Sequence, residues 1–90
     1  MIDYDHDSGQ IDRKVIRALL TVDPGWASLV ELSWNVAHED VDGRRVARAV
    51  ISSLVRQGVL DNLYIRHANK PIEIVHLDHA ALRNYLGDEQ

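Results

Sequence analysis

The stretch DGRRVARAVISSLVRQGVL at residues 42–60 decides the fold of this chain. Asp42 is a suitable N-cap, and Gly58 is a suitable residue just past a helix end. The apolar residues between them recur three and four positions apart, which predicts a helix over 43–57 with one buried side. That side consists of Ala47, Val50, Ile51 and Leu54. The sequence therefore predicts a long amphipathic helix that begins at Asp42–Gly43.

Two shorter helices are predicted upstream of this stretch. Apolar residues fall on one face of a helix over 10–22, and the sequence Asp23-Pro24-Gly25 then ends it, since proline cannot continue a helix. A second helix is predicted over 28–37, where Ser28 and Glu31 have the spacing of a capping box.

A hairpin and a last helix are predicted downstream. Residues 59–67 have strand character, 68–71 form a turn, and 71–77 alternate as a strand with Ile72, Ile74 and His76 on one face. Asp78 can then cap a helix over 79–86. The expected fold is mainly α with a small β-hairpin: a three-helix core, a two-stranded wing and a C-terminal helix.

Length and composition agree with one small domain. Ninety residues support a single core, here expected over 11–86, with a flexible acidic arm at 1–10 and a polar tail at 87–90. The absence of cysteine excludes disulfides and thiol nucleophiles. No apolar run approaches the length that spans a membrane. We therefore expect a soluble cytoplasmic protein with no membrane partner.

Charge is unevenly distributed along the chain. The whole chain has a formal net charge of −4, yet residues 43–70 carry six arginine and lysine residues against Asp61 alone. A continuous basic stretch of this kind can attract phosphate even when the chain as a whole is acidic.

The order of elements and two segments carry a family resemblance. The segments are Ser28–Leu32, in the second helix, and ISSLVRQGVL at residues 51–60, where a helix ends in Gly-Val-Leu before a hairpin. The chain resembles the winged helix-turn-helix superfamily of DNA-binding transcription regulators over roughly residues 11–86, with no subfamily indicated. The resemblance implies that the helix over 43–57 enters the major groove of double-stranded DNA and that the hairpin tip at 66–71 touches adjacent backbone.

The candidate DNA-binding residues follow from that implication. On the helix, Arg44, Arg45, Arg48 and Ser52 are expected to meet base edges or phosphates, and Arg56 to meet phosphate or an acid within the protein. At the hairpin tip, the candidates are Arg66, His67, Asn69 and Lys70.

Other interpretations stay open on the residues alone. The turn before the long helix carries Glu39, Asp40 and Asp42, where DNA-binding relatives often have neutral or basic residues. The arginines could instead meet an acidic protein partner, or form an ordinary solvated helix face. A DNA-binding portion of a phage or plasmid replication protein is a further alternative. If the DNA target is palindromic, we expect a homodimer.

No enzyme site, cofactor or metal is expected. His6 lies among Asp3, Asp5 and Asp7, and His76 lies near Asp78 and His79, but neither set has a known metal-ligand spacing. The acids are scattered, and no Ser/His/Asp arrangement has a motif around it. Trp26 and Trp34 are predicted to belong to the core.

Overall fold

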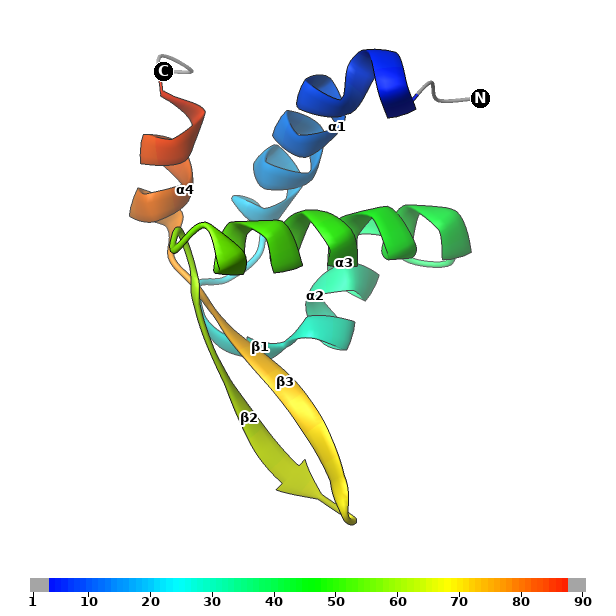
Figure 1. Cartoon of the computed structure of the whole chain (residues 1–90), viewed down its shortest axis with the longest axis vertical. Coiled ribbons are helices and arrows are strands. Elements are labelled where there is room, and N and C mark those ends of the chain that lie inside the picture. Colours follow the sequence, from blue (N-terminus) through cyan, green and yellow to red (C-terminus); the bar gives the residue numbers. More distant parts are fainter. Residues whose placement is uncertain (1–3, 88–90) are drawn as a thin grey trace.

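The computed structural model describes residues 4–87 as a small α/β domain of four helices and a three-stranded antiparallel sheet (Figure 1). Residues 1–3 of the predicted arm and 88–90 of the predicted tail lie outside the described residues. The elements are α1 (Tyr4–Leu19), β1 (Gly25–Ser28), α2 (Leu29–Ala37), α3 (Val41–Arg56), β2 (Asp61–His67), β3 (Lys70–Leu77) and α4 (His79–Leu86).

The first helix differs from its prediction at both ends. It begins at Tyr4, so residues 4–10, which were predicted to form a flexible arm, are helical. Acidic residues near a helix N-terminus favour its dipole, which is a physical reason for this extension. The helix ends at Leu19, after which Thr21 and Val22 donate backbone hydrogen bonds three residues back, to Ala18 and Leu19. These tighter bonds close the helix before Pro24 is reached.

The sheet has one strand more than predicted. Strand β1 has only four residues, too few to show an alternation of apolar and polar side chains, and its last residue, Ser28, also caps α2. It pairs with β3, which pairs with β2 on its other side, to give the order β1-β3-β2. The predicted two-stranded hairpin thus belongs to a three-stranded sheet, and the domain has four helices and three strands.

The hairpin turn is shorter than predicted. Only Ala68 and Asn69 connect the strands, both with positive φ, at 50° and 65°. Lys70 and Pro71, which were predicted in the turn, already pair with His67 and Arg66. Proline donates no hydrogen bond to a sheet, and Pro71 is accommodated because β1 extends only as far as Ile74.

One core holds the helices against one face of the sheet. The buried side of α3 is the predicted set, Ala47, Val50, Ile51 and Leu54. It packs with buried residues of every other helix and of β3, namely Val15, Ile16, Leu19, Leu32, Val75, Leu77, Leu82 and Leu86. On β3 the buried residues Val75 and Leu77 therefore lie opposite the face that carries Ile72, Ile74 and His76.

Figure 1 shows the four helices gathered at one end of the molecule. Strands β2 and β3 run away from them to a turn that no helix covers. Residues from Leu63 to Lys70 are accordingly exposed. The fold thus presents two elements to solvent: the outer side of α3 and a projecting hairpin.

Candidate functional site

The outer side of α3 carries the arginines that the sequence singled out. Arg45 and Arg56 are exposed, and Arg48 and Ser52 are partly exposed. Residues three and four apart share one side of a helix, so these four side chains form a stripe on the side away from Ala47. Within residues 4–87, no hydrogen bond or ion pair engages Arg45, Arg48 or Arg56. We call Arg45, Arg48, Ser52 and Arg56 the arginine stripe.

Arg44 has a different environment from the stripe. Its guanidinium carbon lies 3.9 Å from the centroid of the Trp34 ring, and its Nη1 donates a hydrogen bond to the carbonyl oxygen of His38. Arg44 therefore ties the start of α3 to α2 and to the turn between them. Stacking and a carbonyl acceptor suit the planar guanidinium, and a lysine could not reproduce both contacts.

Both tryptophans were wrongly predicted to lie in the core. Trp26 is 54% exposed and Trp34 is 46% exposed. The Trp34 ring supports Arg44, while the Trp26 ring lies 5.0 Å from the His76 ring on the sheet. Large aromatic side chains are usually buried to a high degree, and the sequence held no signal that these two would face solvent.

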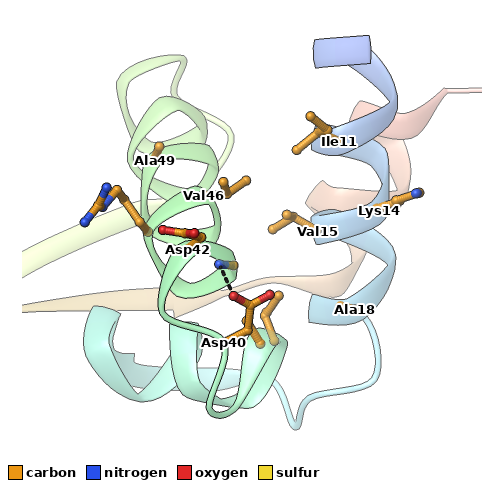
Figure 2. Close-up of a pocket in the computed structure, with 12 residues that line it drawn as sticks. Ile11, Lys14, Val15, Ala18, Asp40, Asp42, Val46 and Ala49 are labelled. Carbon is orange, nitrogen blue, oxygen red and sulfur yellow. Dashed lines mark hydrogen bonds between the residues drawn. The ribbon is translucent and has the colours of Figure 1, made fainter. Parts of the chain in front are cut away.

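The turn between α2 and α3 places carboxylates beside the arginine stripe. The N-cap of α3 is Asp40, whose Oδ1 accepts a hydrogen bond from the Gly43 backbone N–H at 3.0 Å, as Figure 2 shows. The prediction that Asp42 caps this helix is therefore wrong, and Asp42 lies exposed in the first turn. These two carboxylates lower the positive potential at the start of the stripe.

Gly43 allows α2 and α3 to approach closely at this turn. A Cβ at Gly43 would lie 2.9 Å from the Cβ of Ala37 and 2.8 Å from Oδ2 of Asp40. Position 43 therefore needs glycine because a side chain would not fit there. Its backbone conformation, which is that of an ordinary helix, does not require glycine. This close approach fixes the angle at which α3 leaves α2.

An open groove of about 930 Å³ lies between α1 and the first half of α3. Figure 2 shows Ile11 and Val15 of α1 and Val46 of α3 directed into it, while Lys14 points away. Val36 and Ala37 of α2 add to its apolar lining, and Asp40, Asp42 and Arg45 also line the groove. The groove depends on how the helices cross, which no local sequence pattern predicts.

The hairpin tip does not gather its candidate residues on one side. Arg66, His67, Asn69 and Lys70 are all exposed. Arg66 pairs with Pro71, and His67 pairs with Lys70, so Arg66 points to one face and the other pair to the opposite face. Asn69 lies in the turn itself.

His79 and Asp78 each make a contact within the fold. His79 Nε2 lies 2.7 Å from the carbonyl oxygen of Val22, and Asp78 accepts a hydrogen bond from the Ala81 backbone N–H as the cap of α4. Among the described residues, no group of three or more potential metal ligands is found. The side chains of the His6 set lie outside the described part of the chain.

No family model, curated protein or solved structure matches this chain. Within the described residues, every helix is too short or too polar to cross a membrane. Any functional interpretation of α3 and the hairpin therefore rests on their structure alone.

Proposed function

We propose that this chain is a DNA-binding regulator of the winged helix-turn-helix type, in which α3 enters the major groove of double-stranded DNA. The observation that carries the proposal is the arginine stripe. Three arginines stay without a partner among residues 4–87 in a chain that has 14 acidic residues and only 10 basic ones. Guanidinium groups held apart from abundant carboxylates are available to an external anion.

The architecture is compatible with this use of α3. Helices α2 and α3 are joined by the short turn 38–40, and the β2–β3 hairpin directly follows α3 in the chain. A helix packed across a second helix and exposed along its outer side can lie in a groove about 12 Å wide.

The stripe divides into two roles along α3. Arg45 and Arg48 lie in the first half, which would approach base edges, where arginine can bind guanine through two hydrogen bonds. Ala49 is exposed between these arginines and Ser52, and its small side chain allows the centre of the stripe to approach the groove closely. Arg56 lies in the last turn and is assigned to phosphate. Arg44 is assigned a positioning role through Trp34.

The hairpin tip would supply phosphate contacts. Arg66 and Asn69 are placed to reach the backbone beside the groove that α3 occupies, and neither is engaged elsewhere within residues 4–87. Contacts of this kind position a protein on the duplex without reading its sequence.

An acidic protein partner is the second candidate, and Asp40 and Asp42 favour it. Two carboxylates at the start of α3 repel a uniformly anionic duplex. A protein partner can place its own acids opposite the arginines and other groups opposite the two aspartates.

Fluorescence anisotropy with labelled mixed-sequence duplex DNA separates the two candidates. Binding is expected to weaken steeply as salt rises, because each phosphate contact releases counterions. Arg45→Ala and Arg48→Ala should each weaken binding by about tenfold, the equivalent of roughly 1–3 kcal/mol for a lost bidentate contact. Arg83→Ala removes an exposed arginine of α4 and should leave the affinity unchanged. No binding at low salt and high protein concentration would rule out DNA.

A further inference from the structure

One face of the sheet carries apolar side chains that nothing in the described chain covers. Cross-strand partners share a face, so the pairs Trp26–His76, Leu63–Ile74 and Ile65–Ile72 lie together. We call these six residues the open sheet face. The helices pack on the opposite face, through Val75 and Leu77.

Three of the six side chains of the open sheet face are well exposed although they are large and apolar. Trp26 is 54% exposed, Leu63 41% and Ile65 47%, while Ile72, Ile74 and His76 are partly exposed. Contiguous apolar surface of this kind marks a contact site in soluble proteins. The proposed DNA contact does not use it, because a phosphate backbone offers nothing to aliphatic side chains. The face therefore needs an apolar occupant.

The two ends of the open sheet face differ in charge. Asp61 pairs with His76 at the end nearest the helices, where the Trp26 ring is also exposed. His67 pairs with Lys70 at the hairpin tip, on this same face. An acidic and aromatic end is thus separated from a cationic end by an apolar centre.

We propose that the occupant is a second copy of this chain, packed face to face with its hairpin antiparallel to the first. The two-fold axis would pass between the Leu63–Ile74 and Ile65–Ile72 pairs. Lys70 of one copy then lies opposite His76 of the other, whose strand neighbours are Asp61 and Trp26, so the ammonium group can pair with Asp61 and make a cation–π contact with the Trp26 ring. A surface with opposite ends of opposite charge is complementary to itself only in this orientation.

The dimer is weak and its DNA contacts remain available. The open sheet face has six residues, against roughly 20–30 residues a side in a standard interface, so the dissociation constant is expected on the order of 10–100 µM. Arg66 lies on the other face of the hairpin and Asn69 in its turn, so both stay accessible. The inference does not rest on the proposed function, since an apolar face and its charged ends exist whether or not α3 binds DNA.

Sedimentation equilibrium of the full chain tests the inference. The wild type should pass from monomer to dimer as its concentration rises to about 1 mM, a range set by the expected affinity. Ile65→Lys places like charges near the axis and should leave the chain monomeric throughout. Tyr64→Lys is the matched control, because Tyr64 is the adjacent residue, is 65% exposed and points to the other face. Circular dichroism verifies that both variants fold.

Charge reversal tests the orientation. Asp61→Lys and Lys70→Asp should each raise the dissociation constant by about tenfold, since each changes two symmetric contacts. The double reversal should restore it to within about threefold of the wild type, because the pairs re-form with exchanged signs. A wild type that stays monomeric, a Tyr64→Lys variant that dissociates, or a double reversal weaker than both single ones would overturn the proposal.

Discussion

Helix α3 and the β2–β3 hairpin follow one another in the chain but expose opposite kinds of surface. All the large apolar side chains on the inner side of α3 are buried, and its outer side is cationic. The open sheet face of the hairpin leaves Leu63 and Ile65 exposed to solvent and carries its charged residues at its two ends. The difference shows that adjacent elements of one small domain can present a cationic surface and an apolar surface.

The same comparison separates stability from recognition. Helix α3 is central to the stability of the domain, because Ile51 and Leu54 pack in one core with the other helices and the sheet. The half of the hairpin nearest its turn, residues 63–73, contributes little buried surface. Substitutions in the core should therefore affect folding, while those on the hairpin should affect association.

The largest effect is expected from truncating the two regions in parallel. Ile51→Ala removes a fully buried side chain and should lower the free energy of unfolding by about 2–5 kcal/mol. Ile65→Ala truncates a side chain that is 47% exposed and should change it by only about 0.5 kcal/mol. Urea denaturation at low micromolar protein, where the chain is monomeric, measures both. Equal losses would mean that the hairpin is part of the cooperative core.

A smaller effect is expected where α3 meets α2. Gly43→Ala would improve helix propensity by about 1 kcal/mol, but its Cβ would lie 2.9 Å from that of Ala37. The steric overlap with Ala37 should outweigh this gain in helix propensity and lower the free energy of unfolding by about 1–3 kcal/mol.

The cause of that loss is tested by a second substitution. Ala37→Gly removes the Cβ that the new side chain meets, so the double variant should lose less stability than the two single changes added together. Additive losses in thermal denaturation would show that the close approach of the two helices is not the reason for glycine.

The sequence predicted those features that rest on local chemistry. Ser28 and Asp78 cap α2 and α4 as expected, because a short polar side chain precedes each apolar run. Gly58 has a positive φ of 79° just after α3, as its place at the helix end predicted. The hairpin followed from alternation around a turn, although the turn proved to be two residues long.

Features that rest on tertiary packing were not predictable. Whether Trp34 is buried or supports Arg44 depends on how α2 meets α3, which no local pattern encodes. The α1–α3 groove and the open sheet face likewise depend on which sides of the elements the helices cover. Choosing the buried face of β3 needed the positions of the helices, because Ile72, Ile74, Val75 and Leu77 are apolar on both faces.

The smallest predicted effect separates folding from binding within α3 itself, at the two aspartates near its start. Asp40→Ala removes the cap on Gly43 and should lower the free energy of unfolding by about 1 kcal/mol. Asp42→Ala removes only a first-turn charge and should cost about 0.3–0.5 kcal/mol. Both changes remove a negative charge beside the arginine stripe, so both should strengthen binding to duplex DNA at low salt.

The effect of Asp42→Ala on binding distinguishes the two candidate partners of the arginine stripe. If DNA is the partner, the affinity gain from Asp42→Ala should disappear at high salt, because it arises from screened repulsion between exposed charges. If an acidic protein is the partner, with its own groups matched to the two aspartates, the same substitution should weaken binding. Anisotropy titrations of the Asp42→Ala variant at two salt concentrations, with denaturation curves for both variants, therefore distinguish DNA from an acidic protein as the partner of α3.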